Sequence, residues 1–471
     1  MLARFFSSVF FFSSMLAPAC AFTLGDAIAA AERHSADYAA AVYESKAAQE
    51  KPIQARAALL PQVNANVLHQ HQPESVSAST RSRGWSIQAE QALFDRGRWL
   101  QYKQGKITAQ SANFQLRHAA SETAFQAARA YFDVLSAQEQ LVAVRDERQA
   151  FEQQVRQAQA MFQTGAATKI DVQEAMSGYD AAVAKEMAAL NRLQLARSTL
   201  SEMTGLDARE AEAPAFPSPL PDILQDRPQT YWQENADRNN PELAVQRLAA
   251  ANARIALSEV RARHLPRLSA SAGYQDYHSR QEYGGRGQNY RSRGATVSVQ
   301  LTLPLFNSGL TVSQSREAAA RLNQSNMQVE AAERRIRQAV SRAYLDTVGQ
   351  WYQSKAQERL LETNRAKFQA AEKGLGLGLS TILQVVQARQ AESETQQKLA
   401  ETRYAWLSSY AELLHHAGLL DGGSERERFA RLEGIVSETA NSGNGIVVTR
   451  VLKKASLKKS NSRGVSSNKI P

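Results

Sequence analysis

Few residues of this sequence have the types and spacing that chemistry requires. His69 and His71 lie two positions apart on a predicted strand, so their rings would share one face and could supply two ligands to a metal ion. The sequence offers no third ligand at a metal-site spacing. It also contains no P-loop, no glycine-rich dinucleotide turn and no nucleophile elbow. We therefore expect a protein that is not an enzyme and that uses neither a cofactor nor a metal.

The N-terminus has the pattern of a cleaved secretion signal. Arg4 precedes an apolar run over 5–16, and Ala19-Cys20-Ala21 supplies small residues at the spacing of a signal-peptidase site, so residues 1–21 are predicted to be removed. The apolar run is too short for a membrane-spanning helix. Lipidation of Cys20 stays open, although Ala17 stands where such sites usually carry leucine. Cleavage after Ala21 would leave a chain without cysteine and hence without disulfides.

The net charge of +10 is concentrated at one end of the chain. Between 440 and 471 there are seven Lys or Arg residues and no acid, and subtracting those seven and Arg4 leaves +2 for the body. A protein that binds nucleic acid through a coiled coil would carry its basic residues on the helices. We therefore expect no nucleic-acid partner, and we interpret 421–471 as a basic, disordered tail.

An internal duplication relates the two halves of the chain. Leu60-Pro61 is repeated 205 residues later as Leu265-Pro266, and Leu93-Phe94 is repeated 212 residues later as Leu305-Phe306. Three further pairs of segments keep this order: 34–38 with 239–243, 130–133 with 343–346, and 164–168 with 377–381. Each half is therefore predicted to contain a helix that ends at the proline, two strands, and a long helical hairpin.

Alternating apolar and polar residues predict the strands. In 296–303, for example, valine and leucine alternate with threonine, serine and glutamine. A membrane barrel strand needs this period because lipid covers one face and water the other, although an ordinary half-buried hairpin has the same period. The polar segments 72–83 and 277–293 are predicted to be loops that join paired strands and face the cell exterior.

The number of strands constrains the assembly. No segment after Phe22 has 18 consecutive apolar residues, so a role in a membrane would need strands closed into a barrel. Four strands in each chain cannot close a barrel, and lipid does not tolerate open strand edges. Three copies would supply twelve strands, which lies within the range of membrane barrels, so a homotrimer is expected.

The predicted helices are long. Residues 106–164 contain neither Gly nor Pro, and residues 310–373 contain no Pro and a single Gly, Gly349. Large apolar residues recur there at coiled-coil-like intervals, which indicates packing between helices. About 60 helical residues span roughly 90 Å, a length typical of a spacer across a wide gap.

In this layout the chain resembles the TolC-like outer-membrane factors, over about residues 22–420. The resemblance rests on the duplicated order, the Leu-Pro junctions, the Ala-Tyr pairs at 130 and 343, and the glycine-centred turns. It implies a mainly α-helical protein with four β-strands per chain, in which a trimer forms a twelve-stranded barrel in the outer membrane and a twelve-helix tunnel in the periplasm.

The resemblance also implies domain boundaries and partners. The first repeat would cover 22–205, a proline-rich linker 206–226 and the second repeat 227–420, with the tail in the periplasm. Such a duct passes substrates from an inner-membrane ABC or RND transporter and a periplasmic adaptor to the cell exterior, and outer-membrane lipid surrounds its barrel. Whether the substrate is a protein or a drug stays open. The alternative is a periplasmic adaptor or another secreted coiled-coil structural protein.

Two turns between long helices match the family's periplasmic tips, where the adaptor docks. The matching residues are Gly165, Ala166, Ala167 and Thr168 in the first half, and Gly378, Leu379, Ser380 and Thr381 in the second. On the bare sequence these glycines can equally be ordinary helix ends.

The channel gate departs from the family pattern. Relatives often carry aspartates six and nine residues after the second tip glycine, where this chain has Gln384 and Gln387. Asp171 matches the aspartate of the first tip, but its usual Tyr and Arg partners correspond to Leu375 and Ser380. Leu383 fits an apolar ring found in some members, so closure by dewetting is expected. The leucines can also simply pack the helix pair.

Overall fold

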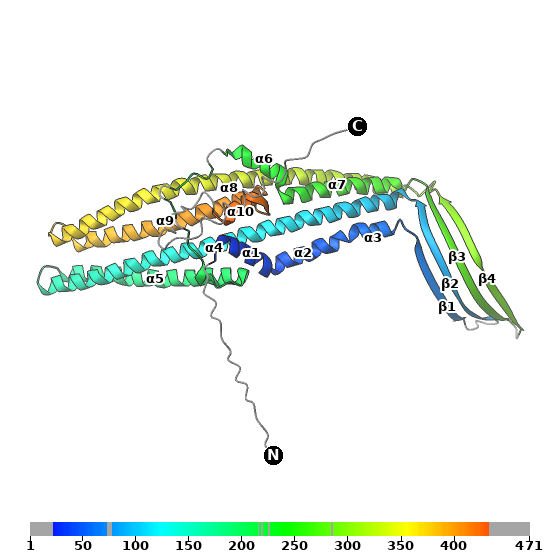
Figure 1. Cartoon of the computed structure of the whole chain (residues 1–471), viewed down its shortest axis with the longest axis horizontal. Helices are drawn as coiled ribbons and strands as arrows, with labels where there is room; N and C mark the ends of the chain where they lie inside the picture. The colour runs from blue at the N-terminus through cyan, green and yellow to red at the C-terminus, as the bar shows by residue number, and fades with distance from the viewer. Residues whose placement is uncertain are drawn as a thin grey trace, which may run out of the picture.

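The computed structural model describes residues 22–72, 78–214, 216–217, 220–224, 227–283 and 286–432. The predicted signal peptide and the tail after 432 lie outside these ranges. The molecule is elongated, with its helices along the long axis and a four-stranded sheet at one end (Figure 1). Within the described ranges, no helix is long and apolar enough to cross a membrane.

Each half has the predicted order of helical segment, two strands and long helical hairpin. The first half contains α1 (Leu24–His34), α2 (Ala36–Gln49), α3 (Lys51–Ala57), β1 (Gln62–Gln72), β2 (Ala78–Phe94), α4 (Arg96–Gln163) and α5 (Lys169–Thr204). After a 3₁₀ turn at Ala208–Glu210, the second half contains α6 (Gln229–Asn239), α7 (Pro241–Ala262), β3 (Arg267–Tyr283), β4 (Arg286–Thr302), α8 (Leu310–Gly376), α9 (Ile382–His416) and α10 (Gly423–Ala430).

The single helix predicted before each strand pair is broken at an equivalent position in both halves. Ser35 caps α2, where its Oγ accepts from the Tyr38 N–H at 3.2 Å. Asn240, 205 residues later, caps α7, where its Oδ1 accepts from the Leu243 N–H at 3.0 Å. These side chains satisfy backbone donors that a new helix leaves unpaired, so both breaks are encoded locally.

The duplication extends to the pairing register of the strands. The sheet is antiparallel in the order β1-β2-β3-β4, which leaves β1 and β4 as its edges. Val63 lies opposite Ala89 in the first hairpin. Their equivalents at offsets of 205 and 212 are Leu268 and Leu301, which lie opposite each other in the second hairpin.

The sheet has one apolar and one polar face over the half nearest the helices. Val297, Val299 and Leu301 lie on one face and are 81%, 64% and 67% exposed in the single chain. The other face carries hydroxyls and amides, including Ser271 and Ser298, whose Oγ atoms lie 2.7 Å apart. This alternation is the one that a sheet with lipid on one side and water on the other requires.

The predicted loops between the strands are wrong in length. The pairing of the first hairpin continues to Gln72 opposite Thr80, and that of the second hairpin continues to Tyr283 opposite Arg286. The polar, Arg-rich composition of these segments concealed them, because strand pairing requires backbone hydrogen bonds and not apolar side chains.

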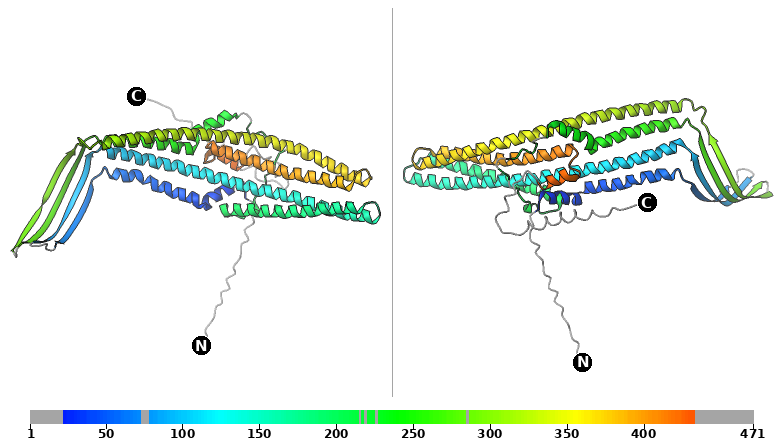
Figure 2. Two further views of the ribbon diagram at one scale, coloured as in Figure 1. Left: turned by 180° about the vertical axis from the view of Figure 1, so that it is seen from behind. Right: turned by 45° about the horizontal axis from the view of Figure 1, so that its top comes forward.

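Two helical hairpins, α4–α5 and α8–α9, run side by side away from the sheet (Figures 1 and 2). The main core lies at the middle of the molecule, where Phe132, Trp232 and Trp406 are almost completely buried. The linker between the halves is fastened to this core: the Tyr131 hydroxyl donates to the Glu212 carbonyl at 2.6 Å, and the Trp351 indole donates to the Pro221 carbonyl at 3.0 Å.

The start of the predicted disordered tail is also part of the core. Residues 423–430 form α10, and Phe429 packs edge to face against Phe132 with only 2% of its surface exposed. The prediction of disorder from 421 onward is therefore wrong for 423–430. The structure of this segment is set by its apolar residues instead.

His415 at the end of α9 should make the stability of the fold depend on pH. Its Nδ1 lies 2.8 Å from the Ser121 Oγ, and burial, followed by the nearby charge of His416, lowers the pKa of His415 to about 4. The unfolded chain would bind this proton near pH 6.5. The stabilisation is therefore complete above pH 6.5 and is lost progressively as the pH falls toward 4.

We expect the melting temperature of the solubilised protein to fall between pH 7 and pH 4.5, and to fall less steeply in His415→Asn. The control is His264→Gln, which changes an exposed histidine. Equal slopes in the wild type and His415→Asn would contradict the assignment.

Candidate docking and gating site at the hairpin tips

The two hairpin tips have the same backbone structure. Gly165 (φ 75°) donates to the Phe162 carbonyl at 3.1 Å, and Gly378 (φ 74°), 213 residues later, donates to the Leu375 carbonyl at the same distance. The two residues after each glycine also match: both of their N–H groups donate to one carbonyl, which belongs to Met161 in the first tip and to Gly374 in the second. Both tips lie at the end of the molecule opposite the sheet (Figure 1).

The backbone conformation at these two positions, and not a lack of space, explains why they are glycines. A Cβ on Gly165 or Gly378 would meet no atom within 4 Å, so crowding does not exclude a side chain. Both residues adopt the left-handed conformation, which costs other residues about 1–2 kcal/mol. These glycines therefore end the helices, and the absence of crowding leaves the tip surface open.

Each tip also begins its returning helix with a capping box, a feature that sequence reasoning missed. In the first tip the Thr168 N–H and hydroxyl donate to Asp171 Oδ2, both at 2.8 Å, and Thr168 Oγ1 accepts from the Asp171 N–H. In the second tip the Thr381 N–H donates to Gln384 Oε1 at 3.0 Å, and Thr381 Oγ1 accepts from the Gln384 N–H. The Thr-x-x-Asp and Thr-x-x-Gln spacings were the available signal.

The capping boxes give the polar gate candidates a local role. The hydrogen bond from the Thr168 backbone N–H, and to a smaller extent the one from its hydroxyl, lower the pKa of Asp171 below its ordinary value. Asp171 therefore stays ionised while it caps its own helix. Gln384 occupies the equivalent position without a charge, so the two tips share a fold and differ in electrostatics.

The two apolar gate candidates, Leu375 and Leu383, differ in burial. Leu375 is 9% exposed and packs in a cluster with Phe151 and Val385, whereas Leu383 is 42% exposed beside the exposed Gln387. The tips carry further exposed apolar side chains: Ile170, Leu377 and Leu379 are 77%, 74% and 80% exposed. Leu377 and Leu379 therefore do not pack the helix pair.

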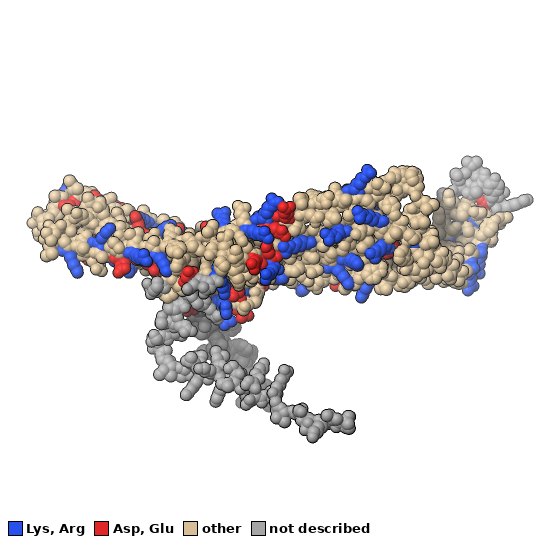
Figure 3. Space-filling view, turned by 90° about the horizontal axis from the view of Figure 1, so that it is seen from above, with Lys and Arg blue, Asp and Glu red and all other residues tan. Residues whose placement is uncertain are grey.

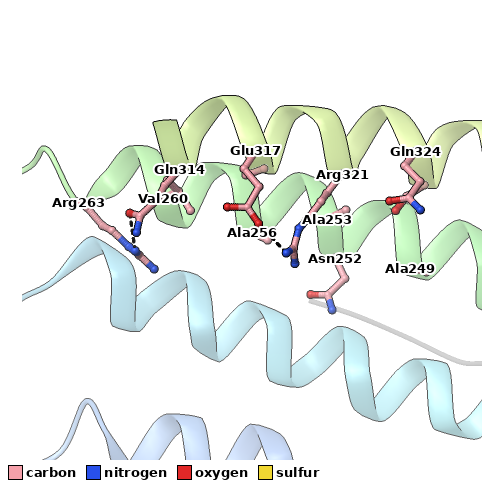
Figure 4. A pocket seen from close by; sticks show the side chains of 12 residues that line it. Ala249, Asn252, Ala253, Ala256, Val260, Arg263, Gln314, Glu317, Arg321 and Gln324 are labelled. Carbon is pink, nitrogen blue, oxygen red and sulfur yellow. Dashed lines mark hydrogen bonds and ion pairs between the residues drawn. The ribbon is translucent and has the colours of Figure 1, made fainter. Parts of the chain in front are cut away.

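The first groove away from the tips shows no convergent catalytic chemistry. A groove of about 580 Å³ lies between α7 and α8 (Figure 4). Both of its arginines are paired within the groove: Arg263 donates to Gln314 at 2.9 Å and Arg321 to Glu317 at 2.6 Å. Among the described residues, no three His, Cys, Asp or Glu side chains gather closely enough to hold a metal ion.

An amphipathic sheet at one end of long paired hairpins defines a channel protein of the bacterial outer membrane. The family model described as outer membrane efflux protein matches residues 27–206 and 232–419, and the chain belongs to this family. The alkaline protease secretion protein AprF of Pseudomonas aeruginosa is 27% identical to it over 433 residues, which cover 85% of this chain and 86% of the relative.

Two other relatives agree with this assignment. The outer membrane protein TolC of Escherichia coli is 27% identical over 391 residues, covering 80% of this chain and 78% of TolC. The crystal structure of the Campylobacter jejuni CmeC outer membrane channel superposes with a TM-score of 0.72 at 13% identity, covering 88% of this chain and 90% of CmeC, and shows the same fold.

The predicted resemblance to TolC-like factors is thereby confirmed. The chain is an outer-membrane export duct and not an enzyme, and its helices lie in the periplasm. Nothing supports the alternative of an adaptor or another secreted coiled-coil protein.

The tip geometry predicts opposite effects for two neighbouring glycine substitutions. Gly378→Ala places a side chain at φ 74°, which should raise the exchange rate of the amides in the first turn of α9 by five- to thirtyfold. Gly376→Ala is the control, because Gly376 is helical and alanine favours a helix. Hydrogen exchange measured by mass spectrometry decides the matter. Equal effects of both substitutions would show that backbone conformation does not select Gly378.

Proposed function

We propose that three copies of the chain close one barrel and one tunnel. The sheet of a single chain has unpaired edges at β1 and β4, and lipid does not tolerate such edges. The exposed apolar face that includes Val297 and Leu301 would face lipid, and the face that includes Ser271 and Ser298 would line the pore. Pairing between the edge strands of neighbouring copies would satisfy the unpaired backbone N–H and C=O groups, and it would turn the apolar face to lipid and the polar face to the pore.

A periplasmic adaptor would dock at the tips, with an inner-membrane ABC or RND transporter behind it. The docking residues are Gly165, Ala166, Ala167 and Thr168 in the first tip, and Gly378, Leu379, Ser380 and Thr381 in the second. The exposed Ile170, Leu377 and Leu379 support this proposal, since apolar side chains at a solvent-exposed turn are the kind that a partner buries.

The substrate class would be protein, exported by type I secretion. One observation carries this choice: the similarity to a protease secretion protein extends over 85% of this chain and 86% of that relative. The test is to replace the duct of a type I protease secretion system by this chain and to measure extracellular protease. Restored drug resistance without restored protease secretion would favour efflux instead.

The tip leucines should decide whether the complex assembles in that assay. Leu377→Ser with Leu379→Ser removes apolar surface from each of three tips, so we expect protease secretion to fall at least tenfold. The matched control, Leu377→Met with Leu379→Met, keeps the apolar surface and should retain secretion. Full secretion by the serine variant would exclude these leucines from docking.

The gate would be formed by Leu383 with Gln384 and Gln387, and without Leu375, which is buried. Asp171 would serve the cap of the first tip. A mouth without a carboxylate ring should select cations only weakly, because fixed charges in a narrow mouth are what concentrate them.

Introducing Gln384→Asp with Gln387→Asp should create cation selectivity and block by multivalent cations from the periplasmic side. Aspartate at 384 keeps the capping box, as Asp171 does in the first tip, so the tip should still fold. Gln384→Asn with Gln387→Asn is the neutral control. Planar-bilayer conductance measures both properties. If the aspartate variant stays indifferent to such ions, the glutamines do not face the pore.

A further inference from the structure

The far end of the sheet carries a basic belt that the export function does not use. The belt consists of five arginines on β2, β3 and β4: Arg81, Arg83, Arg280, Arg291 and Arg293. The register places all of them on the apolar face and none on the face of Ser271 and Ser298. His69 and His71 of β1 lie opposite Arg83 and Arg81, so these histidines belong to the same patch. Figure 3 shows basic side chains at this end of the molecule.

The belt lies where an outer membrane has its outer head groups. Eight residues separate Leu301 from Arg293 along β4, which is about 26 Å of strand. At the tilt of about 40° that barrel strands have, this length covers about 20 Å of the apolar band, which is roughly 25 Å tall. Trp85 and Tyr274 pack together with ring centroids 5.5 Å apart at the border between the apolar rows and the belt. Aromatic residues mark such membrane interfaces. Because the helices lie in the periplasm, the belt faces the exterior.

The charges of the belt are incompletely balanced within the chain. Asp276 pairs with Arg291 at 3.0 Å, and Glu282 pairs with Arg280 at 2.9 Å. Arg293 donates to the Tyr274 hydroxyl at 2.6 Å and shares the charge of Asp276 with Arg291. In the part of the chain that the structure describes, neither Arg81 nor Arg83 forms an ion pair with a carboxylate.

The strand register makes the excess charge unfavourable in the absence of an anion. Arg81 lies directly opposite Arg280, and like charges in such cross-strand pairs repel. A hollow of about 530 Å³ lies among these side chains and is lined by Arg81, Arg83, Arg280 and Arg291. Guanidinium groups around a hollow of this size suit phosphate, which they bind through paired N–H groups.

We propose that the basic belt binds the phosphate groups of phosphorylated glycolipids in the outer leaflet of the outer membrane. The arginines would neutralise the lipid phosphates while Val297, Val299 and Leu301 contact the acyl chains below. The lipid would thereby fix the depth of the barrel in the membrane. This inference rests on the proposed closure of the sheet into a barrel with its apolar face outward.

The test uses the assembled protein extracted in detergent and titrated with bisphosphorylated lipid A, with bound lipid counted by native mass spectrometry. Arg81→Gln with Arg83→Gln should weaken binding about 30-fold, since each basic residue near an anionic lipid surface contributes roughly fivefold. The control, Arg254→Gln with Arg359→Gln, removes the same charge from exposed helix positions and should leave binding within about threefold.

Two further titrations identify the source of the phosphate. In the first, the wild type is titrated with dephosphorylated lipid A, which should bind no more tightly than bisphosphorylated lipid A binds to the Arg81/Arg83 variant. In the second, inorganic phosphate is added to the lipid complex and should not displace the bound lipid. Equal binding of both lipids, complete displacement by inorganic phosphate, or equal weakening by both double variants would each overturn the proposal. The same spectra report the oligomeric mass. Failure of the barrel proposal, seen as a monomer, is therefore distinguishable from failure of the lipid site.

Discussion

The unpaired backbone at the two edges of the sheet is the constraint on which the rest of this structure depends. Each strand edge carries N–H and C=O groups that lipid cannot satisfy, and in the proposed assembly β1 and β4 satisfy them by pairing with other copies. Pairing of copies at the sheet brings their helical hairpins together as well. The exposed Val297 and Leu301 become lipid-facing only in that assembly. The export path therefore follows from the need to close the sheet.

The duplication explains how one chain can satisfy this constraint. The two hairpins of the sheet share a register, and the two tips share their glycine conformation and capping box. The junction between β2 and β3 within a chain is therefore a template for the proposed junction between β4 and β1 of neighbouring copies. The halves differ at Asp171 and Gln384, which are equivalent positions with different charge, so the tips can serve different roles in one ring.

Much of the fold could be predicted from the sequence because repeated residues occur at nearly constant offsets. Leu60-Pro61 and Leu265-Pro266 located the helix–strand junctions, and the glycine turns located the tips. The pattern failed where strands continue with Arg81 or Arg280 in place of apolar residues, since alternation of hydrophobicity was the signal used. It also could not separate the buried Leu375 from the exposed Leu377, because that difference depends on packing against the neighbouring α4–α5 hairpin.

Disulfide trapping between copies tests the closure of the sheet most directly. Ala89 lies opposite Ala272 within the chain, and their repeat equivalents are Leu301 and Val67, which lie on the two outer strands. In the chain predicted to remain after signal removal, which has no native cysteine, Val67→Cys with Leu301→Cys should therefore form an interchain disulfide and yield a covalent trimer on non-reducing gels. Each single substitution should yield no such ring. Absence of the interchain product in folded protein from membranes would contradict the account, because the edges would then not meet.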